Sequence, residues 1–116
     1  RAIADNPPAV LIEAITQGGE IPVSVLTRNL VMSAATKIVH LRNVDHNSAA
    51  GSERVTSRTK ELIRRTHSEP LTKSLVSMRA TLLGESQEFA PFLARTNYDD
   101  EQKSAAIKAI DNLLDN

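Results

Sequence analysis

Three histidines are the residues of this chain best suited to acid–base or metal chemistry. Imidazole titrates near neutral pH and binds zinc, but a metal-binding pair on a helix needs two histidines four residues apart. His40, His46 and His67 lack that spacing, and no cysteine is present to supply thiolate ligands. His46 follows Asp45 directly, and we interpret both as ordinary polar loop residues. The sequence therefore predicts no metal site.

His40 also invites comparison with histidine phosphotransfer domains, which are small helical bundles with a reactive histidine on a long helix. The residues after it, Leu41-Arg42-Asn43-Val44, lack the Lys-Gly and small-residue run that such domains place there. The chain also lacks a phosphate-binding glycine loop, a nucleophile elbow and a helical Glu-x-x-His pair. We therefore expect neither an enzyme nor a cofactor-binding protein.

Positive charge is concentrated in the middle of the chain, although the formal net charge is zero. Residues 37–79 carry nine Lys or Arg and four acids, a net +5, whereas the last 37 residues carry three Lys or Arg and seven acids, a net −4. The two regions could pair across the surface of the fold. Alternatively, one helix presents a basic patch to an acidic partner. The predicted partner-binding residues are Arg54, Arg58, Lys60, Arg64 and Arg65.

These residues predict a non-enzymatic interaction domain, an adaptor or scaffold that binds another protein with an acidic or helical segment. The alternative is peripheral attachment to a membrane or a phosphoinositide through the same basic surface between residues 54 and 65. Nucleic acid fits less well, because the patch lacks interleaved aromatic residues and the pI is near 7.0. Self-association through an apolar strip left by Val31, Val39 or Phe92 is a further prediction.

A short motif lies at the end of the basic region. The segment Arg65-Thr66-His67-Ser68-Glu69-Pro70 resembles the phosphoserine motif bound by 14-3-3 proteins, with Arg three residues before the serine and Pro two after it. The resemblance implies that Ser68 is a phosphosite, whose phosphate Arg64 and Arg65 could pair with. Ser68 is also a natural cap for a following helix, and the two roles are compatible.

Apolar spacing predicts the helices that must position these residues. The longest stripe runs from Pro22 to Asn43, where apolar residues recur at steps of three or four. Ser33, Ala34 and Ala35 would let a neighbouring helix approach closely. The stretch from Leu30 to Leu41 is similar to the amphipathic helices of talin and vinculin bundles, a resemblance of architecture that implies no functional residues. The stripe comprises Val23, Leu26, Leu30, Ala34, Ile38 and Leu41.

The remaining elements follow from helix start and stop signals. We expect a short first helix over residues 7–17, capped by Asn6 and stopped by Gly18-Gly19. A polar loop is predicted over residues 44–52. Further helices are predicted over residues 53–66, from the cap Ser68 to Gly84, over residues 86–95 with Pro91 limiting the length, and from a cap at Asp99 or Asp100 to the end.

Taken together, the patterns predict an all-α fold, an up-and-down helical bundle of four main helices plus one or two short ones. With 41% apolar and 24% charged residues, the composition is that of an ordinary globular domain. We expect residues 1–116 to be a single helical-bundle domain excised from a longer protein, since the chain starts without Met and ends on a helix-like segment. Neither a membrane span nor a signal-peptide core is apparent, and we expect a cytoplasmic location.

Overall fold

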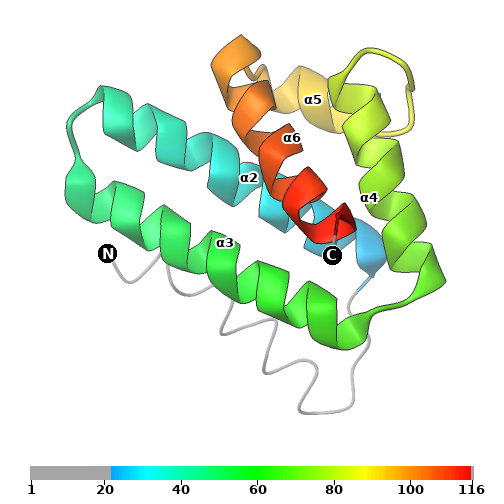
Figure 1. Ribbon diagram of the computed structural model, residues 1–116. Coiled ribbons are helices and arrows are strands. Elements are labelled where there is room, and N and C mark those ends of the chain that lie inside the picture. The colour runs from blue at the N-terminus through cyan, green and yellow to red at the C-terminus, as the bar shows by residue number, and fades with distance from the viewer. Residues whose placement is uncertain (1–21, 116) are drawn as a thin grey trace.

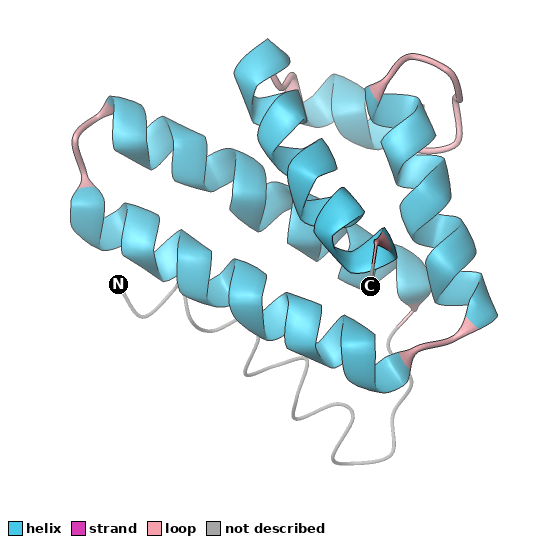
Figure 2. Ribbon diagram, viewed as in Figure 1, coloured by secondary structure: helices cyan, strands magenta, loops and turns pink. Residues whose placement is uncertain are grey.

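The computed structural model describes residues 22–115 and confirms the all-α helical bundle. Four of the five helices in this part are long, one is short, and no strand occurs among the described residues (Figures 1 and 2). The first helix predicted from the sequence lies outside the described residues. The helices are α2 (Val23–Arg42), α3 (His46–Thr66), α4 (Glu69–Leu82), α5 (Ala90–Thr96) and α6 (Asp100–Leu114).

Helix α2 is the central element of the bundle. It contacts α3, α4 and α6, and α4 also contacts α6. Helices α2 and α3 run antiparallel as a hairpin, α6 crosses α2, and α5 connects α4 to α6 on the far side of the view (Figure 1). The stripe predicted for α2 is therefore the surface on which the other long helices pack from Leu26 to Ala34, whereas Leu41 at its end is exposed.

The core forms where the apolar faces of α2, α4 and α6 meet. Leu30, Val31, Met78 and Ile110 are completely buried. Such side chains each contribute on the order of 1.5–3 kcal/mol by leaving water. Two residues of the predicted self-association strip, Val31 and Phe92, belong to this core, so that strip does not exist as predicted. Of the three, only Val39 is exposed.

A ladder of three polar contacts joins α2 to α3. The amide Nδ2 of Asn29 donates to Thr59 Oγ1 at 2.8 Å, and Thr56 Oγ1 donates to Ser33 Oγ at 2.8 Å. Lys37 Nζ completes the series with Glu53 Oε1 at 2.8 Å. The partners on α2 are four residues apart and those on α3 three apart, so they follow one face of each helix. We call these three pairs the polar ladder, and they fix the register of the hairpin.

Helix α3 begins seven residues earlier than the sequence predicted, so the prediction of a loop over residues 44–52 is wrong. The side chain of Asp45 accepts a hydrogen bond from the Ser48 backbone N–H at 3.1 Å and caps the helix. Ala49 and Gly51 are buried, and a glycine without a side chain suits close packing between helices. Turn-forming residues are thus used inside a helix, because packing outweighs their weak helix propensity.

The remaining helix ends largely confirm the predictions. Ser68 caps α4 through the Leu71 N–H at 3.3 Å, and Gly84 follows that helix with φ of +82°, a conformation that glycine adopts without strain. Asp99, not Asp100, caps α6. Pro91 lies in the first turn of α5 and so begins that helix instead of limiting it.

The small residues of the α2–α3 seam give a direct stability test. Ser33→Leu should lower the free energy of unfolding by about 1–3 kcal/mol, because it overpacks the site where Ser33 meets Thr56. The matched control is Thr36→Leu, since Thr36 is exposed on the same helix. Urea denaturation measures both, and equal stability of the two variants would contradict close packing at this seam.

Candidate partner-binding surface

The five basic residues predicted to form one patch lie on two faces of α3. Successive helical residues are about 100° apart, so residues 54, 58 and 65 share one stripe and residues 60 and 64 another. The second stripe faces α6, since Arg64 Nη2 donates to Asn112 Oδ1 at 3.2 Å. We call Arg54, Arg58 and Arg65 the outer arginines. The five residues therefore do not form a single patch.

The outer arginines are exposed and share their stripe with an acid. Arg65 Nε contacts Glu61 Oε2 at 3.2 Å, one helical turn back along α3. An exposed pair of this kind stabilises a helix by only about 0.3–0.5 kcal/mol. The stripe is thus a solvated face of mixed charge, with arginine in excess.

The second stripe borders a groove between α3 and α6. This α3–α6 groove has a volume of about 530 Å³ and lies over the C-terminal half of α2. Its floor is apolar and made largely of short side chains. Its walls carry charged and hydroxyl side chains from both flanking helices. The floor comprises Ala34, Ile38, Leu41, Ala105 and Ala109, and the walls include Glu53, Thr56, Lys60, Glu101, Ser104 and Lys108.

Two ammonium groups of the groove walls are left without a carboxylate partner. Lys37 is paired with Glu53, whereas Lys60 and Lys108 form no salt bridge or hydrogen bond within residues 22–115. Partial burial lowers the pKa of Lys60 below its usual value, the carboxylate of Glu53 acts in the opposite direction, and the positive charges of Arg64 and Lys37 add to the lowering. A carboxylate placed in the groove would relieve this repulsion.

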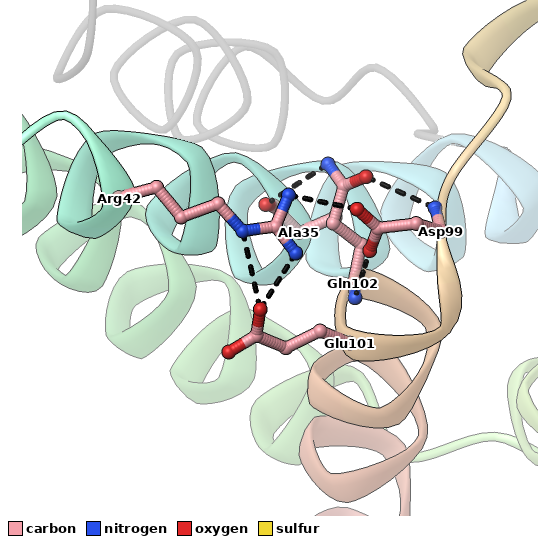
Figure 3. Close-up of polar contacts among 5 residues, drawn as sticks. All are labelled: Ala35, Arg42, Asp99, Glu101 and Gln102. Atoms are coloured by element: carbon pink, nitrogen blue, oxygen red, sulfur yellow. Dashed lines mark hydrogen bonds and ion pairs between the residues drawn. The ribbon is translucent and has the colours of Figure 1, made fainter.

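The α6 wall of the groove is held in place by a cluster at the C-terminal end of α2 (Figure 3). Arg42 contacts Asp99 Oδ2 at 2.7 Å through Nη1 and Glu101 Oε1 at 2.6 Å through Nη2. Asp99 and Gln102 form a capping box, and Gln102 Nε2 also donates to the Ala35 carbonyl at 3.4 Å. The cluster ties the first turn of α6 to the last two turns of α2.

Electrostatics in this cluster favour the charged forms of both partners. The carboxylates of Asp99 and Glu101 raise the pKa of Arg42 above its usual value. Arg42 and then the Gln102 N–H hold the pKa of Asp99 below its ordinary range. Because Glu101 is engaged by Arg42, it is not the partner of Lys60 or Lys108.

Pairing between the basic middle and the acidic end of the chain is confirmed. Arg42 binds the two acids at the start of α6, and Arg79 Nε contacts Asp111 Oδ1 at 2.5 Å. Part of the predicted charge excess is therefore used inside the molecule. Within residues 22–115, this pairing leaves Lys60 and Lys108 of the groove without an acidic partner.

Ser68 lies between two helices and has an extended backbone conformation. Its hydroxyl accepts the Leu71 N–H, while Thr66 ends α3 and Glu69 begins α4. Ser68 lines a second hollow of about 420 Å³ together with Arg64 and His67. Its role as a cap is confirmed, and its phosphorylation stays a prediction.

The histidines do not gather into a site. His46 is the first residue of α3, so its interpretation as a loop residue is wrong, and His67 follows the same helix as its C-cap in a left-handed conformation. Asp45 is the cap of α3, and its hydrogen bonds with Ser48 lower its pKa. No group of three or more potential metal ligands occurs among residues 22–115.

Residues 1–113 match the family described as uncharacterised conserved protein UCP020893, and the chain belongs to that family. No curated protein and no solved structure matches the chain significantly. None of the helices between residues 22 and 115 has the length and apolar character needed to cross a membrane.

The Arg42 cluster predicts how stability depends on pH. Because Asp99 has a lowered pKa in the folded state, its contribution to stability is present above the unfolded pKa and is lost as the pH falls through the folded value. Asp99→Asn retains a capping side chain but removes the charge. The variant should have a lower melting temperature than the wild type at pH 6, and the difference should shrink between about pH 5 and pH 2.

Thermal unfolding followed by circular dichroism at stepped pH measures this effect. Asp100→Asn is the matched control, because Asp100 lies in the same turn of α6 and its side chain forms no hydrogen bond or ion pair with residues 22–115. A pH-independent difference between wild type and Asp99→Asn would contradict the assigned role of the Arg42–Asp99 pair.

Proposed function

We propose that this protein is a non-enzymatic interaction module, an adaptor or scaffold whose α3–α6 groove binds an acidic amphipathic helix of a partner protein. The observation that carries the proposal is the pair of ammonium groups, Lys60 and Lys108, without a carboxylate partner beside an apolar floor. A partner with carboxylates flanking an apolar stripe matches both features. The site therefore uses only the part of the predicted basic face that turns toward α6.

The shape of the groove fits this kind of ligand. Its floor follows α2 from Ala34 to Leu41, which is about 10 Å along the helix axis, or two turns. Helices that bind in grooves use apolar anchors at positions i, i+3 or i+4 and i+7, which cover a similar length. Leu41 is 43% exposed and offers apolar surface at the open end of the floor.

The charges would contribute mainly to orientation and to the rate of association. Lys60 belongs to α3 and Lys108 to α6, so they lie on opposite walls. A bound helix with acids on both flanks would meet one ammonium group on each side. Ser104 supplies a hydroxyl group beside them for hydrogen bonds to a polar flank.

Attachment to an anionic membrane is the second candidate, and it would use a different face. The outer arginines present three cations on one exposed stripe of α3, an arrangement that suits lipid headgroups. The groove walls would then be uninvolved. The two candidates are separable because their cations lie on different stripes of the same helix.

Binding of a synthetic peptide tests the proposal. A 16-residue helical peptide with leucine anchors and glutamates on both flanks should perturb the amide resonances of groove residues such as Ala105 and Ala109. The double variant Lys60→Glu/Lys108→Glu should bind at least tenfold more weakly, and binding should weaken with salt. The matched control Arg58→Glu/Arg65→Glu should retain wild-type affinity.

Equal affinity of both double variants would contradict binding in the groove. Loss of affinity only in the Arg58/Arg65 variant would place the site on the outer face. Sedimentation with phosphatidylserine vesicles tests the membrane candidate, since retention that depends on Arg58 and Arg65 would favour it over the groove.

A further inference from the structure

The second hollow, which contains Ser68, lies where three helices meet at one end of the bundle. Its lining comes from the last turn of α3, the first two turns of α4 and the last turn of α6, whose red end lies between the other two in Figure 1. We call it the three-helix hollow. It shares no lining residue with the α3–α6 groove. Its apolar lining comprises Ile63, Leu71, Leu75, Leu113 and Leu114.

The aliphatic side chains of this hollow are not fully packed. Leu71 and Leu75 are buried, whereas Leu113 and Leu114 are only partly buried and pack on the edge of the core. A hydrocarbon placed among them would remove the remaining apolar surface from water. The volume of about 420 Å³ falls within the range of roughly 300–1,000 Å³ that is usual for small-molecule sites. The hollow is therefore large enough for a small apolar ligand.

Two basic side chains lie at the mouth of the three-helix hollow, and no acid belongs to its lining within residues 22–115. Arg64 bonds only to the neutral amide oxygen of Asn112, at 3.2 Å. His67 is exposed, and its side chain forms no hydrogen bond or ion pair with the described residues. A ligand should therefore carry a negative charge at this end. The acids beside the hollow in sequence are paired with other bases, Glu61 with Arg65 and Glu69 with Lys73.

The hydroxyl groups of the hollow are already used inside the first turn of α4. Ser68 Oγ accepts the Leu71 N–H at 3.3 Å, and Thr72 Oγ1 donates to the Ser68 carbonyl at 3.2 Å. A peptide segment in the hollow would bury backbone N–H and C=O groups that need partners. An aliphatic chain has no polar group to satisfy, so it suits this lining better than a peptide does.

We propose that the three-helix hollow binds a free medium-chain fatty acid, with the aliphatic chain among the leucines and the carboxylate at Arg64 and His67. The planar guanidinium of Arg64 presents parallel N–H donors that match the two oxygens of a carboxylate. The imidazole of His67 offers a further N–H donor at the mouth. This site does not depend on the proposed function, because the hollow and the groove have separate lining residues.

Titration of the full chain with octanoate and decanoate tests the site, with the methyl resonances of isoleucine and leucine as the readout. The methyl groups of Ile63, Leu71 and Leu113 should shift in a saturable manner. Decanoate should bind roughly tenfold more tightly than octanoate, because two more methylene groups leave water. Decylammonium has a ten-carbon chain and the opposite charge, and it should bind about tenfold more weakly than decanoate.

Two variants test the assigned head-group residues. Arg64→Glu should weaken the binding of decanoate about tenfold. The matched control is Arg65→Glu, since Arg65 is the next residue, is exposed and does not line the hollow. His67 has φ of +31°, a conformation that glycine adopts without strain. His67→Gly should therefore weaken binding without lowering the melting temperature.

The absence of saturable methyl shifts would overturn the proposal. Equal affinity of the Arg64→Glu and Arg65→Glu variants for decanoate would overturn it as well, and so would equal binding of decanoate and decylammonium. Shifts centred on Ala105 and Ala109 would place the ligand in the α3–α6 groove and contradict the assigned site. Circular dichroism of each variant confirms that the chain is folded before titration.

Discussion

The contact between α2 and α3 is the constraint on which the rest of the structure depends. Asn29, Ser33 and Lys37 meet Thr59, Thr56 and Glu53 in sequence, so the two helices can pair in one register only. The Asn29–Thr59 pair is partly buried and the Ser33–Thr56 pair is buried. Leaving their polar groups unpaired would cost about 1–3 kcal/mol each. Within residues 22–115 no buried side-chain nitrogen or oxygen lacks a partner. A hairpin with a shifted register would leave some of these buried polar groups without a partner.

This register decides which cations of α3 can act together. Once Thr56 and Thr59 face α2, helical geometry turns Lys60 and Arg64 toward α6 and the outer arginines away from it. The opposite wall is set independently, because Arg42 holds the first turn of α6 against the end of α2. Two independent sets of contacts therefore form the α3–α6 groove. The polar ladder positions α3, and the contacts of Arg42 position α6. Both sets of contacts determine where the ammonium groups of Lys60 and Lys108 lie.

Much of the fold could be predicted from the sequence because it is encoded by local signals. The long apolar stripe of α2, the Ser68 cap and the Gly84 stop depend on residues within a turn or two of each other. The early start of α3 could not be predicted in this way. Its first two turns contain Asn47, Ser48 and Gly51, which favour turns locally, and they become helical through packing on a distant part of the chain.

The candidate site was predicted only in part for a related reason. A count of basic residues between 54 and 65 identifies one helix that borders the α3–α6 groove but not the face that does so, since the face depends on which side of α3 is buried. Val55, Leu62 and Ile63 do mark that side, and helical spacing from them separates Lys60 from Arg58. The second half of the groove, including Lys108, comes from α6 and has no signal in the sequence around α3.

Amide hydrogen exchange of the native protein tests most directly whether the α2–α3 contact holds the bundle together. The most slowly exchanging amides should lie in α2 between Leu26 and Ala35 and in the facing part of α3 between Val55 and Ile63, with a common opening free energy near that of global unfolding. Protection that is highest in α4 and α6, with α3 exchanging early and separately from α2, would contradict the dependence of the fold on this contact.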